Sequence, residues 1–299
     1  MEDANTTTKN RHGVVLSGGA SLGAVQVGMM KALTEAHTPV DFFVGTSVGA
    51  INAAWMAGHH DATGVDGLVE IWRTLRRRDV FTTKLTRSAL AIGGRRQSFF
   101  SDTGLRRLLQ RHLNFEFLEE APVPLHVVAV DVLSGRDVLL SSGPAIEAVM
   151  ASAALPGFLP PVAIGNRWYM DGGVVNNAPL TYAAQLGAST VWVLPAGYPC
   201  ALSKPPDSAL AMALQGLSTL VQHRLALDAL RWHDGIELRV VPPLCPITIS
   251  PIDFSHSSEL IELAYRSTSD WLSAGCPDVG ASLYPHEHAS SGARMDIAW

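Results

Sequence analysis

The stretch that decides the fold is Val40-Asp41-Phe42-Phe43-Val44-Gly45-Thr46-Ser47-Val48-Gly49-Ala50. Its apolar first half predicts a buried strand, and the small residues over 50–56 predict a helix. Between them lies the pattern G-x-S-x-G, in the strand–turn–helix setting that presents a nucleophilic serine. We therefore expect Ser47 on a sharp, strained turn with its hydroxyl clear of the sheet. Gly45 and Gly49 would leave the room that so tight a turn requires.

A second glycine-rich turn lies earlier in the chain. Residues 13–16 predict a strand that runs into Ser17-Gly18-Gly19-Ala20-Ser21-Leu22-Gly23, and the apolar spacing over 25–33 predicts a helix. A turn of this kind leaves backbone N–H groups uncovered, which suits an anion. The amide of Val48, first in the helix after Ser47, has the same property.

Several interpretations of the turn at Gly18 are open. A dinucleotide-binding loop has G-x-G-x-x-G, whereas the glycines here follow G-G-x-x-x-G. A nucleotide-binding Walker loop needs Gly-Lys-Ser/Thr, which the sequence lacks. The turn could instead hold the oxyanion formed at Ser47, or could simply be tight for packing. Two successive strands that each end in a glycine-rich turn favour a shared site, because parallel neighbours bring both turns to one sheet edge.

Asp171 is the candidate general base. A predicted strand over 167–170 ends at Asp171-Gly172-Gly173, and two glycines allow close approach to a neighbouring group. Asp-Gly is also a common turn dipeptide, so an ordinary turn is the competing interpretation. Asn176 and Asn177, which follow, either order this loop or only turn it.

Taken together, these motifs resemble those of the patatin-like phospholipases. The resemblance rests on residues 18–23, 45–49, 151–161 and 171–179. It implies a serine–aspartate dyad of Ser47 and Asp171 without a catalytic histidine, acting through an acyl-enzyme. It also implies an oxyanion hole formed by the amides of Gly18, Gly19 and Ala20, with Gly23, Gly45, Gly49, Gly172 and Gly173 supporting the motifs.

The sequence departs from the family pattern at two positions. Ala20 stands where a third glycine is usual, which is a mild change because alanine still supplies an N–H. Leu22 stands where an Arg or Lys is common. The missing basic side chain leaves the preference for a phospholipid headgroup open.

The expected architecture is a single α/β domain over residues 12–276, with a mostly parallel sheet in a three-layer α/β/α arrangement. Residues 1–11 are expected to form a flexible leader and residues 277–299 a loose tail. Further strands are predicted over 124–132, 138–141, 162–164, 189–194 and 236–241, and helices over 66–78, 145–154, 179–186, 207–232 and 259–273.

Residues 73–100 are a candidate cover for the site. Eight basic residues and one acidic residue lie over 73–96, interleaved with apolar ones. Such a segment could touch an anionic lipid surface, or could be a solvated connection.

Composition narrows the class of protein. The net charge of −5 argues against a dedicated nucleic-acid binder, and no run of apolar residues is long enough for a membrane-spanning helix. The first residues lack the pattern of a secretory signal. Cys200, Cys245 and Cys276 form no C-x-x-C pair, so free thiols in a cytoplasmic protein, with no metal or cofactor, are expected. Contact with a membrane or micelle would then be peripheral.

The sequence therefore favours hydrolysis of lipid acyl esters by Ser47 and Asp171. A Ser–His–Asp triad would also be possible, since eleven histidines are available. His126 lies inside a predicted strand, where a structural role is the simpler interpretation. Two further possibilities are a nucleotide-binding protein that uses the turn at Gly18 and a non-catalytic lipid-binding relative.

Overall fold

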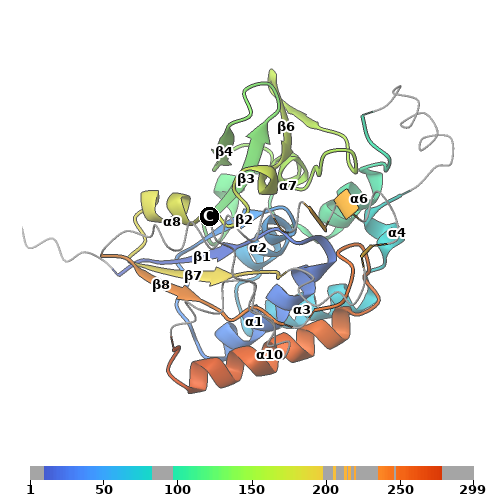
Figure 1. Cartoon of the computed structure of the whole chain (residues 1–299). Coiled ribbons are helices and arrows are strands. Elements are labelled where there is room, and N and C mark those ends of the chain that lie inside the picture. Colours follow the sequence, from blue (N-terminus) through green and yellow to red (C-terminus); the bar gives the residue numbers. More distant parts are fainter. Residues whose placement is uncertain are drawn as a thin grey trace, which may run out of the picture.

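A mixed sheet of eight strands forms the centre of the molecule (Figure 1). The computed structural model describes residues 10–82, 97–197, 205–206, 212–213, 215–216, 219, 235–245 and 247–277. The strand order is β5-β6-β3-β2-β1-β7-β8, with β4 paired to β3. The strands are β1 (His12–Leu16), β2 (Phe42–Thr46), β3 (Leu125–Asp131), β4 (Asp137–Leu140), β5 (Val162–Ile164), β6 (Arg167–Asp171), β7 (Thr190–Leu194) and β8 (Glu237–Val240).

Helices flank this sheet. They are α1 (Gly23–Glu35), α2 (Val48–Gly58), α3 (Ala62–Thr74), α4 (Arg77–Val80), α6 (Thr103–His112), α7 (Ala145–Ser152), α8 (Leu180–Gln185) and α10 (Ser257–Ser273). Short 3-10 turns occupy Ala20–Leu22, Leu118–Glu120 and Gly172–Val174.

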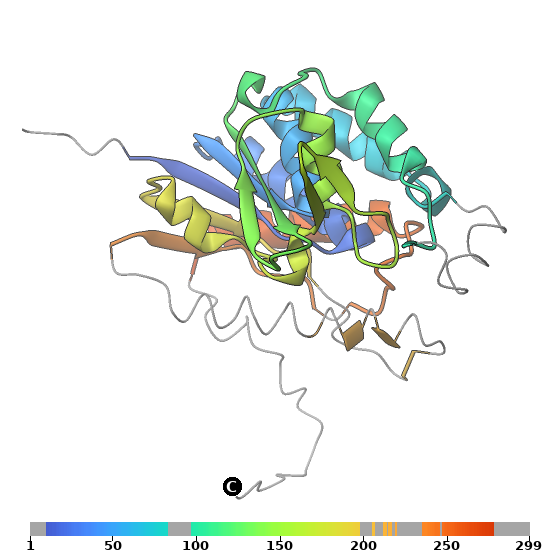
Figure 2. The same cartoon turned by 90° about the horizontal axis from the view of Figure 1, so that it is seen from above.

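The direction of the strands sets where the site can form. β1 pairs in parallel with β2 and β7, β2 with β3, and β7 with β8. Both glycine-rich turns, after β1 and after β2, therefore lie at the same edge of the sheet. β4 and β6 run antiparallel to β3, and their hairpins lie nearest the viewer in Figure 2.

Successive side chains of each strand point to opposite faces of the sheet, and this divides the core into two layers. Val14 and Leu16 of β1 pack into a cluster with α1, α2, α3 and α10, whereas Val15 packs with Leu180 and Ala183 of α8. In Figure 1, α1, α3 and α10 lie below β1 and β7, and α8 lies above them. This confirms the predicted three-layer α/β/α class with a mostly parallel sheet.

The predicted single helix over 66–78 is wrong at both ends, since α3 already begins at Ala62 and does not continue to residue 78. α3 ends at Thr74, because Leu75 adopts an extended backbone (φ −61°, ψ 135°), and α4 begins two residues later. The Asp79 carboxylate accepts a hydrogen bond from the Arg76 amide at 2.8 Å, which caps the new helix. The chain therefore bends at Leu75 instead of continuing as one helix.

Some predictions fall outside the described residues. These are the leader up to residue 9, the middle of the candidate cover (83–96), most of the predicted helix over 207–232, and the tail from residue 278. Within the described part of the chain, no helix combines the length and apolar composition needed to cross a membrane.

The cysteine prediction needs a correction. Cys276 carries a free thiol, but Cys245 is disulfide-bonded. Sequence spacing alone could not reveal this bond, because it depends on which segments the fold brings together. The cysteines therefore no longer argue for a reducing compartment.

Helix α1 packs closely against α10 at Gly28, and a substitution there tests this packing. A Cβ at Gly28 would lie 2.2 Å from the Ile261 carbonyl oxygen and 2.8 Å from the Tyr265 nitrogen, both backbone atoms. Gly28→Ala should therefore lower the free energy of unfolding by about 1–3 kcal/mol, measured by urea denaturation. Gly216→Ala is the matched control, since no atom lies within 4 Å of a Cβ there. Equal stability of the two variants would contradict this packing.

Candidate active site

Ser47 occupies the turn between β2 and α2 with φ 56° and ψ −124°. A positive φ is unfavourable for a residue with a Cβ, by about 1–3 kcal/mol, and persists only when surrounding contacts impose it. Here the Ser47 amide donates to Ser152 Oγ at 2.8 Å, and that hydroxyl donates to the Val128 carbonyl at 2.6 Å. Ser152 thus ties the strained turn to the neighbouring strand β3.

The two glycines of the motif are required by close backbone approach. A Cβ at Gly45 would lie 2.5 Å from the Ala50 Cα, and one at Gly49 would lie 2.2 Å from the Leu16 carbonyl oxygen. Both contacts are with backbone atoms, which cannot move aside cheaply. The sequence prediction of a tight turn at these positions is therefore confirmed.

Ser47 and Asp171 meet across β3. Thr46 pairs with Val128 and Asp171 with Ala129, so β2 and β6 hold the two side chains on either side of one strand. Ser47 Oγ donates to Asp171 Oδ2 at 2.7 Å. This distance suits direct proton transfer between the hydroxyl and the carboxylate.

Burial controls the charge of Asp171. Its side chain is 3% exposed, and Oδ1 accepts a hydrogen bond from the Gly173 amide at 2.7 Å. Loss of solvation raises the pKa of Asp171 from 3.8 to about 6, while the hydrogen bonds from Ser47 and Gly173 act in the opposite direction. The carboxylate is therefore ionised at neutral pH and more basic than an exposed aspartate.

The glycine-rich turn after β1 lies against the same site. Ala20 lines a pocket together with Ser47 and Asp171. Within the described residues, the amides of Gly19, Ala20 and Val48 donate to no protein group. Gly18 differs from the prediction, because its N–H donates to the backbone oxygen and side-chain oxygen of Asn177, at 3.3 and 3.1 Å. Its amide is used to hold the turn.

Asn177 explains how the two loops are joined. Besides accepting from the Gly18 amide, its Nδ2 donates to the Gly18 carbonyl at 3.3 Å. The preceding carbonyl, that of Asn176, accepts from Thr46 Oγ1 at 3.1 Å. The loop after Asp171 is thus bonded to the glycine-rich turn and to strand β2, which precedes Ser47.

The two departures from the family pattern have structural consequences. Ala20 adopts φ 51°, a region that glycine occupies freely and alanine does not. Leu22 is 1% exposed and belongs to the core, so the place of the usual basic residue is apolar here. No cation stands at position 22 beside the glycine-rich turn.

A buried polar network supports both turns from below. Gln26 donates to the carbonyls of Ser17 and Leu194, at 2.7 and 2.9 Å. Asn52 donates to Gln26 at 3.0 Å and accepts from the Trp72 indole at 2.9 Å. Both amide side chains are fully buried, and their hydrogen bonds fix α1, α2 and α3 relative to one another.

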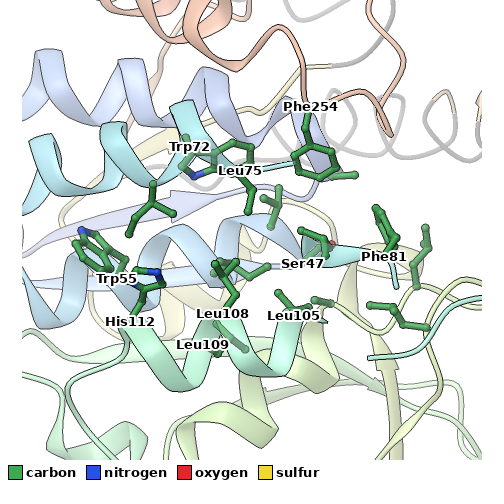
Figure 3. A pocket seen from close by; sticks show the side chains of 18 of the residues that line it. Ser47, Trp55, Trp72, Leu75, Phe81, Leu105, Leu108, Leu109, His112 and Phe254 are labelled. Carbon is green, nitrogen blue, oxygen red and sulfur yellow. The ribbon is translucent and has the colours of Figure 1, made fainter. Parts of the chain in front are cut away.

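An apolar pocket opens from the serine (Figure 3). The centre of a water-sized molecule can move through about 90 Å³ of it, so the pocket is narrow. In Figure 3, Trp55 and His112 lie at one end, Phe81 and Phe254 at the other, and Ser47 between them. Among the described lining residues, Asp171 and His112 are the only ones with an ionisable acid or base at neutral pH.

Sequence reasoning missed Ser152 and did not settle the role of Asn177. The signal for Ser152 was a lone hydroxyl among apolar residues near the end of a predicted buried helix. A polar side chain in such a place must find a hydrogen-bond partner. The partners themselves, 105 and 159 residues away, could not be deduced from local patterns.

Ser47 lies on a sharp strand-to-helix turn at the edge of a mostly parallel sheet, in hydrogen-bonding contact with the Asp171 carboxylate, an arrangement found in α/β proteins that carry a G-x-S-x-G motif. The family model described as patatin-like phospholipase matches residues 14–184, more than half of the 299-residue chain. The chain therefore belongs to the patatin-like phospholipase family.

Its relatives are larger proteins. Patatin-like phospholipase domain-containing protein 7 of Rattus norvegicus is 29% identical over 196 residues, which cover 65% of this chain and 14% of the rat protein. An uncharacterized NTE family protein of Mycobacterium tuberculosis is 33% identical over 168 residues, covering 56% of this chain and 27% of the relative. The matched region is thus a minor part of each relative.

Among solved structures, VipD from Legionella pneumophila matches with a TM-score of 0.49 and 14% identity, covering 89% of this chain and 67% of that one. ExoU from Pseudomonas aeruginosa, in complex with SpcU, matches with a TM-score of 0.44 and 15% identity, covering 90% of this chain and 53% of that one.

The pKa of Asp171 predicts a link between pH and stability. Because its pKa is near 6 in the folded state and lower in the unfolded chain, the folded state binds the proton more tightly. The free energy of unfolding therefore falls as pH rises from about 4 to about 6. Asp171→Asn should be more stable than the parent at pH 8, by on the order of 1–3 kcal/mol, and this gain should shrink by pH 4.

Urea denaturation at the two pH values measures this difference. Asp270→Asn, at an exposed position on α10, is the control and should show no comparable gain. A stability difference between parent and Asp171→Asn that is the same at pH 4 and pH 8 would contradict the raised pKa.

Proposed function

We propose that the chain hydrolyses carboxylic esters of lipids, with Ser47 as nucleophile and Asp171 as general base. The observation that carries the proposal is the 2.7 Å hydrogen bond between the two side chains at the wall of an apolar pocket. Membership of the patatin-like phospholipase family supports a lipid substrate.

The reaction begins with proton transfer. Asp171 Oδ2 takes the hydroxyl proton as Ser47 Oγ attacks the ester carbonyl carbon. The carbonyl oxygen becomes an oxyanion, for which the amides of Gly19 and Ala20, together with that of Val48, are the available donors. Each such donor typically lowers the barrier by about 3–4 kcal/mol. Gly18 shapes this turn through Asn177.

The remaining steps return the enzyme to its starting state. The bond to the leaving alcohol breaks, and that alcohol receives the proton from Asp171, leaving an acyl-Ser47 ester. Asp171 then removes a proton from water, which attacks the acyl carbon. The second tetrahedral intermediate collapses to release the fatty acid, and Asp171 gives the proton taken from water to Ser47 Oγ. The same carboxylate thus serves as base, acid, base and acid in turn.

The histidine positions disfavour a Ser–His–Asp triad. Within the described chain, no histidine hydrogen-bonds to Ser47 or Asp171. His126 instead contacts Ser141 at 2.7 Å, and burial lowers its pKa. His112 lies at the far end of the pocket (Figure 3). Asp171 occupies the place at the serine that a triad gives to histidine.

The pocket also disfavours nucleotide binding. A nucleotide phosphate needs cationic or multiple polar partners, yet the described walls of the pocket carry neither lysine nor arginine. The apolar lining is suited to an alkyl chain. For a non-catalytic lipid-binding relative, nothing would require the strained backbone at Ser47 or the desolvated carboxylate beside it.

Ester hydrolysis tests the dyad directly. On p-nitrophenyl butyrate, Ser47→Ala should fall to the rate of the uncatalysed reaction, and Asp171→Asn should lose roughly 10²- to 10⁴-fold in kcat/KM. His126→Gln, the control for a triad, should keep its activity. Equal turnover by the parent and the two dyad variants would remove the proposed mechanism.

We also propose that the arginines beside the pocket contact an anionic lipid surface. Arg107 and Arg111, one turn apart on α6, share a groove with Arg78 of α4. All three are exposed, and within the described residues none forms an ion pair. Ile71, Leu75, Leu108 and His112 line both this groove and the apolar pocket, so the groove lies directly outside the pocket wall. Its three arginines outnumber the two acidic residues that also line it, Glu70 and Asp79.

Vesicle sedimentation measures this contact. The double variant Arg107→Glu/Arg111→Glu should bind vesicles of phosphatidylcholine with phosphatidylglycerol at least tenfold more weakly, since each basic residue near such a surface contributes about 1 kcal/mol. Arg239→Glu/Arg266→Glu makes the same change in net charge elsewhere and should bind like the parent. An equal loss of vesicle binding in both double variants would show that net charge alone determines binding. That result would contradict a contact at Arg107 and Arg111.

A further inference from the structure

We infer that Trp55 limits the length of the acyl chain, so that the substrates are esters of medium-chain fatty acids of about eight to ten carbons. This inference rests on the proposed function, because it takes Ser47 as the point where the acyl carbonyl is held. The arm of the pocket between Ser47 and Trp55 is the acyl site (Figure 3).

The length of this arm follows from the positions of its lining residues along helix α2. Ser47, Val48, Ile51 and Trp55 all line the pocket, at a spacing that places them along one side of the helix. Eight residues of α-helix rise about 12 Å. An extended alkyl chain advances roughly 1.25 Å per carbon, given C–C bonds of about 1.5 Å at about 111°. Dividing about 12 Å by roughly 1.25 Å gives close to ten carbons, and the half-thickness of the ring that ends the arm removes roughly one or two of them.

The end wall is rigid because the Trp55 ring is held on several sides. Its Nε1 donates to the Gly64 carbonyl at 2.7 Å. The ring stacks on His59 with centroids 4.1 Å apart and an angle of 14°, and meets the edge of His112 at 5.8 Å. A Cβ at Gly67 would lie 3.0 Å from Trp55 Cζ2, so α3 packs closely against the indole. A longer chain cannot displace this ring by a simple rotation.

The side walls favour an alkyl chain up to that point. Leu75, which follows α3, faces Leu105, Leu108 and Leu109 of α6 across the pocket (Figure 3), and Leu68 and Ile71 of α3 also line it. Each methylene buried between them should improve kcat/KM roughly three- to fourfold. Beyond the ring of Trp55 the gain ends, because further carbons must bend back or stay in water.

A chain-length series tests the inference. With p-nitrophenyl esters of 4 to 16 carbons, kcat/KM of the parent should rise to a maximum at about eight to ten carbons and then fall. Trp55→Ala removes the ring and should move the maximum about four carbons toward longer esters. Ile51→Trp places a ring one helical turn nearer to Ser47 and should move the maximum to about four carbons. Shifts in opposite directions cannot both arise from reduced stability.

The control is Trp168→Ala, which removes an indole that is 49% exposed on β6 and should keep the parent profile. If Trp55→Ala does not fold, Ile51→Trp and Trp55→Phe decide the question. Unchanged maxima in these variants, with hydrolysis that still depends on Ser47, would overturn the chain-length inference alone. Hydrolysis that does not depend on Ser47 would overturn the proposed function, and the inference with it.

Discussion

The hydrogen bond between Ser47 and Asp171 is the interaction on which the rest of the arrangement depends. It joins residues 124 positions apart, across a strand that belongs to neither of them. Keeping it short requires a strained backbone at Ser47 and a desolvated carboxylate at Asp171, both of which are unfavourable alone. The surrounding structure must compensate for both, and most of the polar contacts near the site do so.

Three sets of contacts provide this support. Ser152 holds the amide of the strained residue, Asn177 holds the glycine-rich turn, and the Gln26–Asn52 pair fixes the helices beneath them. Each hydrogen bond contributes only about 1 kcal/mol, so no single one maintains the site. The local motifs are short, but the site they form is stabilised by segments from most of the described chain.

The contrast between short local motifs and supporting contacts from distant segments explains what the sequence could and could not predict. Gly45 is required by close approach within its own turn, and Gly49 and Gly172 by close approach to the backbone of neighbouring segments, yet each belongs to a motif of a few residues that identifies it. The same holds for the alternating strands of the three-layer core. Partners at long separation, such as Ser152, have no local signature. The bend at Leu75 and the disulfide at Cys245 depend on tertiary packing too, as does the place of Trp55 in the wall of the pocket.

The central claim is that Asp171 makes Ser47 nucleophilic. An octyl fluorophosphonate phosphonylates an activated serine with loss of fluoride. Peptide mass spectrometry of this single reaction gives the site of the adduct and the rate at which it forms. The account predicts one adduct, on Ser47, that forms at least 100-fold more slowly in Asp171→Asn, consistent with the usual effect of a general base. An adduct on another serine, or equal rates for the parent and Asp171→Asn, would contradict it.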